Sequence, residues 1–277
     1  MESLPPSLKQ SNNVIYGVAD PERGVYHIKL NRPEKNNALT KEMSEQIVAC
    51  LHEAATDESV KALLMYGTNG QFCAGNDVEM ILKSDPVPFE KISEQMFAIV
   101  NFPKPFFIYV EGCVVGNLAC LIAFGDFVYY SEEAFSMTPF MSANLSIEGL
   151  SSIMYPKLVG RRKASELLLL DQRLYAKDAL KYGFINGIIT NNQRPKTEPY
   201  IKDIDKIPNL QKVLQTNLKT FMNAKRLMLE GLDPQFLKTH NLREQKTFFD
   251  AVSHPDFKKK MQIYIKNLQK KQPQPKL

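Results

Sequence analysis

Short apolar runs alternate with amphipathic stretches over the first 190 residues. A helix is expected at residues 40–56, because Met43, Ile47 and Leu51 recur at helical spacing behind Thr40, a good N-cap residue. Apolar or alternating runs predict strands at residues 14–18, 25–30, 60–66, 106–110, 127–130, 134–137 and 184–189. Strands separated by helices in this way favour an α/β fold with parallel neighbours.

The second half of the chain changes character. Short helices are expected at residues 164–170 and 176–181, and the polar, proline-bearing stretch 191–208 predicts a connector. From Leu210 onward, apolar residues recur at helical spacing among lysines. We therefore expect a core over residues 1–190, a helical region over 191–271 and a flexible tail over 272–277.

Composition and charge exclude several classes of protein. Of the 277 residues, 44% are hydrophobic and 23% are charged, as in globular proteins. No apolar run reaches the ~18 residues that a membrane span needs. The net charge is +5, and residues 241–277 carry nine Lys or Arg against three Asp or Glu. This basic end fits an anionic ligand or a solvated helix; without interleaved aromatic residues, it does not predict nucleic-acid binding.

Familiar catalytic signatures are missing from the sequence. It has no Gly-x-Gly-x-x-Gly, no Walker-type loop, no His-Glu-x-x-His and no Gly-x-Ser-x-Gly. The four cysteines form no Cys-x-x-Cys pair and the four histidines are scattered. We therefore expect no metal site.

Two segments predict turns that expose backbone N–H groups. In Gln71–Met80, small residues up to Gly75 follow a strand, and Asp77 can cap a helix that begins near Val78. In Val110–Cys120, the turn at Gly116 leads into an apolar helix that ends near Asp126. Two such turns could converge on one oxygen as an oxyanion hole. The alternatives are an ordinary strand-to-helix turn in the first segment and, in the second, an Asn117 that only caps a helix.

A third segment, Ser142–Ser152, holds one carboxylate among small and apolar residues. Burial there would disfavour the charged form of Glu148 and raise its pKa, which suits a base or acid that works near neutral pH. The alternative is a surface glutamate at the start of a helix.

These three segments, in this order, resemble the crotonase (enoyl-CoA hydratase/isomerase) superfamily. Asn31–Leu39 is similar to the family's Asn-Arg-Pro segment, and Ala176–Ile185 to its Ala-Gly-Leu-Val passage from helix to strand. The resemblance implies a crotonase fold, a spiral of ββα units with a C-terminal helical trimerisation region. It also implies a homotrimer or hexamer.

The resemblance assigns roles to residues that match the family's motifs. It implies that the backbone N–H groups of Asn76 and Asn117 hold the thioester oxygen of an acyl-CoA, and that Ala74 contacts the adenine part of CoA. Lys35 is expected near the CoA phosphates on charge alone. The expected substrate-binding residues are Lys35, Ala74, Gly75, Asn76, Asp77, Val78 and Gly116.

The position of the carboxylate indicates the reaction. Where the family's hydratases have two glutamates, this chain has Cys120 and Pro139. Peroxisomal-type isomerases use one glutamate in a Pro-Glu-Gly-x-Ser-Ser setting, which Glu148 matches except that Ile147 replaces the proline. The resemblance thus implies a Δ3,Δ2-enoyl-CoA isomerase of unsaturated fatty-acid β-oxidation. It needs no cofactor, because CoA belongs to the substrate. Three alternatives remain open: another crotonase-fold enzyme (a hydratase or dienoyl isomerase), a non-catalytic acyl-CoA-binding homologue and an RNA-binding homologue.

The two ends of the chain bear on its location. Pro275-Lys276-Leu277 is a variant of the C-terminal peroxisomal tripeptide, which an import receptor recognises. The N-terminus has no basic-then-apolar signal pattern, and its first arginine is Arg23. We expect a peroxisomal protein, with the mitochondrion as the alternative.

Overall fold

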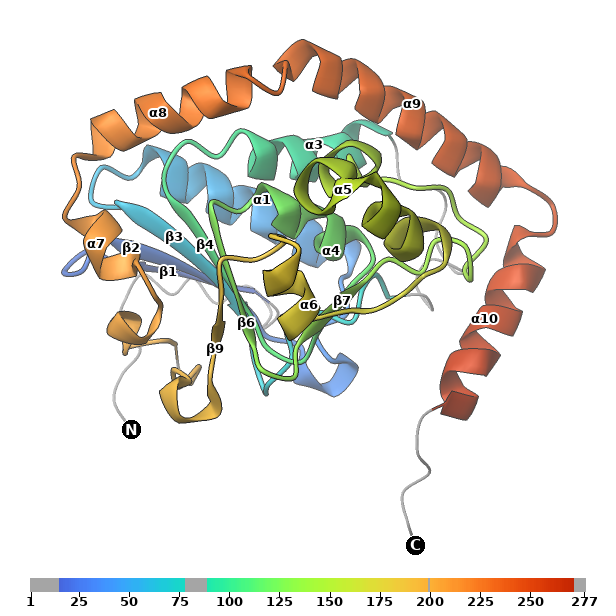
Figure 1. Cartoon of the computed structure of the whole chain (residues 1–277), viewed down its shortest axis with the longest axis horizontal. Helices are drawn as coiled ribbons and strands as arrows, with labels where there is room; N and C mark the ends of the chain where they lie inside the picture. Colours follow the sequence, from blue (N-terminus) through green and yellow to red (C-terminus); the bar gives the residue numbers. More distant parts are fainter. Residues whose placement is uncertain (1–14, 78–88, 199, 272–277) are drawn as a thin grey trace, which may run out of the picture.

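One six-stranded sheet forms the centre of the molecule. The structure is a computed structural model that describes residues 15–77, 89–198 and 200–271. The order of the sheet is β1-β2-β3-β4-β6-β9 (Figure 1); β1 and β2 pair antiparallel, and all later neighbours pair parallel. The strands are β1 (Ile15–Asp20), β2 (Val25–Leu30), β3 (Ala62–Gly67), β4 (Phe106–Val110), β6 (Phe127–Ser131) and β9 (Gly187–Ile189). The parallel arrangement predicted from the alternating pattern is confirmed.

A smaller sheet runs beside the first, with the order β5-β7-β8. It contains β5 (Cys113–Val115), β7 (Phe135–Met137) and β8 (Leu174–Tyr175). Each of two successive turns of the chain gives one strand to each sheet and then a helix: β4, β5 and α4 (Asn117–Leu121), followed by β6, β7 and α5 (Ser151–Leu169). This repeat is the spiral of ββα units that the resemblance implies.

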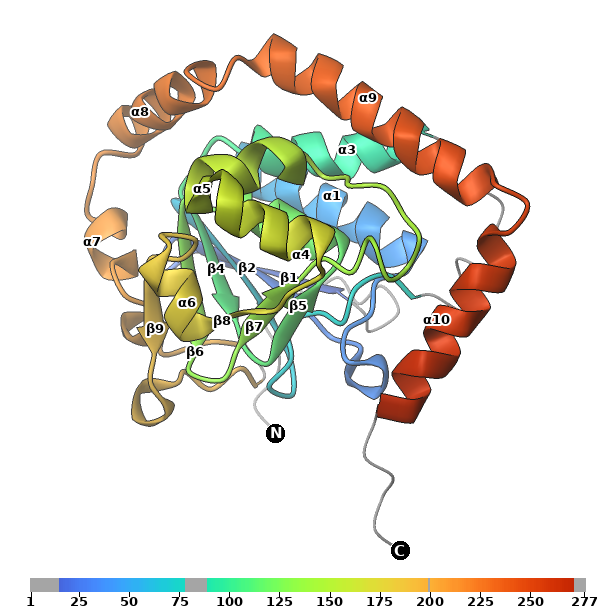
Figure 2. The same cartoon turned by 45° about the vertical axis from the view of Figure 1, so that its right-hand side comes forward.

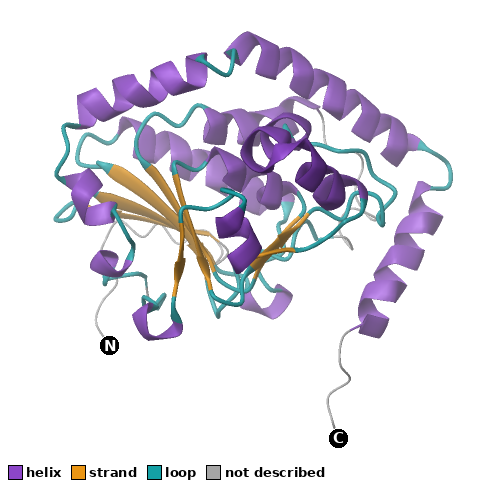
Figure 3. Ribbon diagram, in the orientation of Figure 1, coloured by secondary structure: helices purple, strands orange, loops and turns teal. Residues whose placement is uncertain are grey.

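Long helices cover one face of the large sheet, and loops with short helical segments, α7 (Leu210–Leu214) among them, cover the other (Figure 3). A first core of buried side chains packs α1 (Lys41–Thr56), α3 (Phe89–Val100), α4 and α5 against the sheet. On the opposite face, Ile201, Ile204 and Ile207 pack against strand residues such as Tyr66 and Tyr109. Strands buried on both faces read as continuous apolar runs, as β3 and β4 do.

Several predicted elements differ from those in the structure. The helix expected at residues 164–170 is the end of α5, which starts at Ser151 and continues past Pro156 and a kink at Gly160. Those two residues interrupt the helical pattern in the sequence, so its first half was missed. The strand expected at 184–189 pairs only over Gly187–Ile189, although Phe184 and Ile185 are buried. The helix start expected near Val78 and the tail 272–277 lie outside the described residues.

Other expectations hold closely. Thr40 caps α1, because its hydroxyl accepts a hydrogen bond from Met43 N at 3.2 Å. The strands at 25–30 and 106–110 and the helix α6 (Ala176–Lys181) have the predicted bounds. The helix after Gly116 is α4, which a 3-10 turn at Ile122–Phe124 continues. In the described residues of the connector, 191–198 and 200–208, the helical elements are 3-10 turns at Asn191–Gln193 and Ile204–Lys206.

The C-terminal helices form an arc around the outside of this body (Figure 2). They are α7 (Leu210–Leu214), α8 (Leu218–Glu230), α9 (Pro234–Ser253) and α10 (Phe257–Lys271). A largely buried ion pair ties α8 to the sheet, because Lys225 Nζ lies 2.6 Å from Asp126 Oδ2. Buried amides tie α9 to α3, with Gln245 Nε2 donating to Ser93 Oγ at 2.8 Å. In the described part of the chain, no helix has the length and apolar character to cross a bilayer.

Candidate active site

The loop that follows β3 pairs with β5. Cys73 N donates to Cys113 O at 2.9 Å, and Val115 N donates to Cys73 O at 3.0 Å. Because both β3 and β4 end at the same edge of the parallel sheet, the segments that leave them are close enough to pair. The pairing aligns the two turns that the sequence singled out.

Gly75 and Gly116 stand next to one another in these turns. A Cβ placed on Gly116 would lie 3.8 Å from Gly75 Cα, and one placed on Gly75 would lie 3.3 Å from the Val115 carbonyl oxygen. Both glycines have positive φ, 98° and 67° respectively, which side-chain-bearing residues rarely adopt. Two turns that are 41 residues apart in sequence therefore converge, as expected for an oxyanion hole.

The amides of Asn76 and Asn117 have no acceptor within the described ranges. Leu39 N donates to Gly75 O and Asp77 N donates to Leu39 O, both at 2.8 Å, so the intervening Asn76 N–H points away from Leu39. Asn117 is the first residue of α4, and its N–H has no intrahelical acceptor. Gly116, not Asn117, occupies the N-cap, so the alternative that Asn117 caps the helix is wrong.

The Asn-Arg-Pro segment supports the first of these turns. Arg32 Nη2 lies 2.8 Å from Asp77 Oδ2, and Arg32 Nη1 donates to Ala38 O at 2.9 Å. Ala74 N donates to Asn36 O at 3.0 Å, which places the exposed Lys35 beside the same turn. Ala74, Gly75, Asn76 and Asp77 thus lie together, and Lys35 directly precedes Asn36, the hydrogen-bond partner of Ala74. Val78, the remaining predicted binding residue, lies outside the described residues.

Glu148 is buried, so the alternative of a surface glutamate is wrong. Its relative exposure is 6%. Burial raises the pKa of Glu148 to about 7, a hydrogen bond from the Asn117 side chain opposes that rise, and the nearby charge of Glu244 adds to it. A carboxyl group of this kind can give up and take back a proton at neutral pH.

Glu148 lies against the start of α4. A Cβ on Gly149 would be 2.7 Å from Cys120 Cβ, so the chain beside Glu148 packs onto the first turn of that helix. The Asn117 side chain, at the start of the same helix, lowers the pKa of Glu148. The second amide turn and the buried carboxylate are therefore neighbours. The sequence predicted a main-chain role for Asn117 but gave no sign of this side-chain effect on Glu148.

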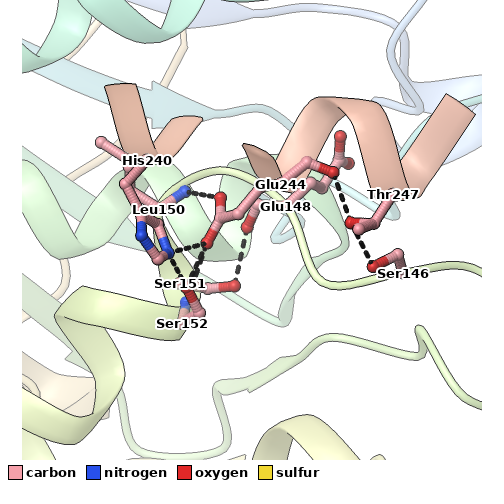
Figure 4. A network of polar contacts seen from close by, with 8 residues as sticks. All are labelled: Ser146, Glu148, Leu150, Ser151, Ser152, His240, Glu244 and Thr247. Atoms are coloured by element: carbon pink, nitrogen blue, oxygen red, sulfur yellow. Dashed lines mark hydrogen bonds and ion pairs between the residues drawn. The ribbon is translucent and has the colours of Figure 1, made fainter. Parts of the chain in front are cut away.

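A network of polar contacts holds the segment that carries Glu148 (Figure 4). Glu148 O accepts from Ser151 N at 3.2 Å and from Ser151 Oγ at 2.7 Å. The Glu244 carboxylate, from α9, accepts from Leu150 N at 2.7 Å and from Ser152 N at 3.3 Å. Sequence analysis missed Glu244, because no local pattern links a glutamate on a C-terminal helix to a turn over 90 residues earlier.

The positions of the hydratase glutamates hold no second carboxylate. Cys120 is fully buried, and desolvation, together with the charge of Glu148, raises the pKa of its thiol well above the usual value. Pro139 has no ionisable group. Within residues 15–77, 89–198 and 200–271, no three His, Cys, Asp or Glu side chains gather as metal ligands would.

Comparisons with known proteins agree with this geometry. The sequence pattern of the "Enoyl-CoA hydratase/isomerase" family matches residues 20–274. The Homo sapiens protein "Enoyl-CoA delta isomerase 2" is 31% identical over 211 residues, 69% of this chain and 53% of that protein. The Mus musculus protein "Enoyl-CoA delta isomerase 3, peroxisomal" is 28% identical over 254 residues, 88% of this chain and 76% of that protein.

A solved structure is similar over nearly the whole chain. That of Pseudomonas aeruginosa OdaA superposes with a TM-score of 0.82 at 25% identity, and the match covers 92% of this chain and 99% of that one. The chain spans about half the length of the human relative. The family match, the spiral fold and the paired turns lead to one conclusion: the chain belongs to the enoyl-CoA hydratase/isomerase (crotonase) family.

Proposed function

We propose that the protein is a Δ3,Δ2-enoyl-CoA isomerase of unsaturated fatty-acid β-oxidation. The observation that carries the proposal is the buried carboxylate of Glu148, whose pKa burial raises to about 7 and which lies beside the second of two convergent amide turns. One such group suffices to move a proton between two carbons. The names of two relatives, enoyl-CoA delta isomerases 2 and 3, support the same reaction.

In the proposed reaction, the Glu148 carboxylate removes a proton from C2 of a 3-enoyl-CoA. The electron pair of the broken C–H bond moves toward the thioester and forms an enolate. The Asn76 and Asn117 N–H groups stabilise the enolate oxygen. Collapse of the enolate shifts the double bond to C2–C3, and protonated Glu148 returns its proton to C4. The product is a 2-trans-enoyl-CoA, and the enzyme ends as it began.

The substrate would bind along the first turn. Ala74 would face the adenine part of CoA, and Gly75, Asn76, Asp77 and Gly116 would line the path to the thioester. Lys35 is exposed beside this turn, where its ammonium group could pair with a CoA phosphate. CoA enters as part of the substrate, so the reaction requires no separate cofactor.

Hydration is the competing reaction for this fold. Water addition needs a base for the water and an acid for the carbon, and the two positions where the family's hydratases have glutamates hold Cys120, whose thiol pKa burial raises well above its usual value, and Pro139. Purified protein should therefore convert 3-hexenoyl-CoA to its 2-trans isomer and hydrate crotonyl-CoA very slowly or not at all. Absorbance of the conjugated thioester measures both reactions. Brisk hydration of crotonyl-CoA would contradict the isomerase proposal, and tight acyl-CoA binding without turnover would favour a non-catalytic homologue.

Replacement of the base gives a second prediction. Glu148→Gln keeps the size of the side chain but cannot accept the C2 proton, so the isomerase rate should fall by about 10²–10⁴-fold while acyl-CoA still binds. In the unmodified enzyme the active form is the carboxylate. Its rate should therefore rise about tenfold per pH unit below the pKa of about 7 and level off above it. Near-normal isomerisation by Glu148→Gln would exclude Glu148 as the base.

The second amide turn gives a third prediction. A Cβ at Gly116 meets no atom closer than 3.8 Å, so Gly116→Ala tests the backbone conformation at a φ of 67° rather than crowding. The strained alanine should displace the Asn117 N–H and cost about 10²–10³-fold in rate, the usual effect of losing one oxyanion donor. Gly70→Ala, at a similar φ of 66° and also in open space, is the matched control for strain outside the site. Full turnover by Gly116→Ala would remove this turn from the mechanism.

We also propose a peroxisomal location and a homo-oligomer, a trimer or hexamer. The mouse relative is named peroxisomal, and the chain ends in Pro275-Lys276-Leu277. Exposed apolar side chains such as Leu170, Tyr175, Leu227 and Met228 suit contacts between copies. We do not propose a nucleic acid as a partner.

Deletion of the C-terminal tripeptide tests the location. A fluorescent fusion at the N-terminus should colocalise with a peroxisomal marker, because an import receptor would bind the free C-terminus. The same fusion without residues 275–277 should stay in the cytosol and keep its isomerase activity in lysates. Unchanged peroxisomal staining after the deletion would refute a signal at this end, and mitochondrial staining of the intact fusion would favour the alternative.

A further inference from the structure

The turn that carries Glu148 has an unusual backbone. Gly149 and Leu150 both have positive φ, 67° and 56°, and Leu150 is fully buried. A leucine in the left-handed region is strained, and such strain persists only where the surroundings enforce it. Ser151 then begins the right-handed helix α5. A left-handed residue followed by a right-handed one directs the N–H groups of Leu150 and Ser152 toward one point, which forms an anion-binding concavity.

The carboxylate of Glu244 fills this concavity. One oxygen accepts from Leu150 N at 2.7 Å, and the other accepts from Ser152 N at 3.3 Å and from Ser152 Oγ. Glu244 itself is buried, with 6% relative exposure. Because α5 has no side-chain cap of its own, a residue from α9 satisfies its first N–H groups. Figure 4 shows the contacts of the Glu244 carboxylate with Leu150 and Ser152, and Glu148 nearby in the same segment.

We infer that Glu244 is a positioning residue for Glu148: its carboxylate holds the strained turn from Gly149 to Ser152 in the one conformation that directs Glu148 toward the thioester. The catalytic part of this inference rests on the proposed isomerase function. Glu148 O is itself bound by Ser151 N and Ser151 Oγ, so a movement of the turn would move Glu148 as well. Displacements of about 1 Å at a reacting group can cost 10²-fold in rate.

The same carboxylate also acts on Glu148 through its charge. The charge of Glu244 raises the pKa of Glu148, whereas the Asn117 side chain lowers it. The other titratable groups around the pair are Cys120 on α4, whose thiol pKa is raised well above its usual value, and His240 on α9. His240 Nε2 lies 2.9 Å from Ser152 Oγ and 3.8 Å from Glu244 Oε1, and desolvation and the charge of Arg243 lower its pKa.

Two variants separate the geometric role from the electrostatic one. Glu244→Asp keeps the charge but is one methylene shorter, and Glu244→Gln keeps the reach but removes the charge. Asp250→Asn is the control, because it removes an exposed charge from the same helix without touching the turn. Two readouts apply to each variant: steady-state isomerisation of 3-hexenoyl-CoA, and the titration of the Glu148 carboxyl group by infrared difference against Glu148→Gln.

We expect Glu244→Asp to lower kcat by about 10- to 100-fold with KM changed less than about threefold. We expect Glu244→Gln to move the titration midpoint of Glu148, and the acidic limb of kcat, to lower pH. Asp250→Asn should match the unmodified protein in both readouts. Unmodified kcat in Glu244→Asp, or an unmoved midpoint in folded Glu244→Gln, would overturn the inference.

The two proposals can fail separately. If the unmodified protein does not isomerise 3-hexenoyl-CoA, the proposed function fails, while a midpoint lowered in Glu244→Gln still supports the coupling of the two glutamates. If the unmodified protein isomerises the substrate and either folded Glu244 variant matches it in the readout predicted to change, only the role of Glu244 fails. Circular dichroism reports whether each variant is folded, and the titration of Glu148 needs no substrate. Each variant has its own decisive readout, so one folded variant is enough to test the role of Glu244.

Discussion

Two backbone hydrogen bonds between the loop after β3 and strand β5 are the basis of the site. Cys73 N to Cys113 O and Val115 N to Cys73 O fix how far each chain extends before it turns. Gly75 and Gly116, placed two residues and one residue later, then meet at near van der Waals distance. The paired segments belong to different turns of the spiral, so the parallel order of β3 and β4 has to form before the amides can converge.

The buried carboxylate is a cost that the rest of the structure has to offset. The pKa of Glu148 is raised from 4.5 to about 7, so the folded state binds the proton more tightly than the unfolded chain. The free energy of unfolding therefore falls by roughly 3 kcal/mol as the pH rises from about 4.5 to about 7, at 1.36 kcal/mol per pH unit. Asn117 offsets part of this cost and Glu244 adds to it. A group that served stability alone would not be placed there.

The C-terminal helices belong to the same structural unit as the sheet. Ile201, Ile204 and Ile207 cover one face of the sheet, so residues 191–208 form part of the core as well as a connector. Farther on, Asp126 accepts from both Phe106 N and Lys225 Nζ, which links α8 to the sheet through one buried carboxylate. Glu244 then links α9 to the turn beside Glu148. Polar contacts thus connect the helical arc to the sheet at Asp126 and to the candidate site at Glu244.

Local pattern was sufficient for much of the fold. The apolar runs predicted β2 and β4 to the residue, Thr40 predicted the start of α1, and glycines after two strands predicted both amide turns. Each of these follows from periodicity, capping or backbone freedom within about ten residues. The prediction was wrong at α5, because Pro156 and Gly160 interrupt the helical sequence pattern although tertiary packing keeps the segment helical.

The sequence by itself determined which groups were available: one glutamate among small residues, two glycine turns, and no carboxylate at positions 120 and 139. Only the tertiary structure decided that Glu148 is buried, that the Asn117 side chain lowers its pKa, and that Glu244 holds its turn. Desolvation and charge coupling depend on distances between residues far apart in the chain, and those distances exist only after the spiral and its helical arc have formed.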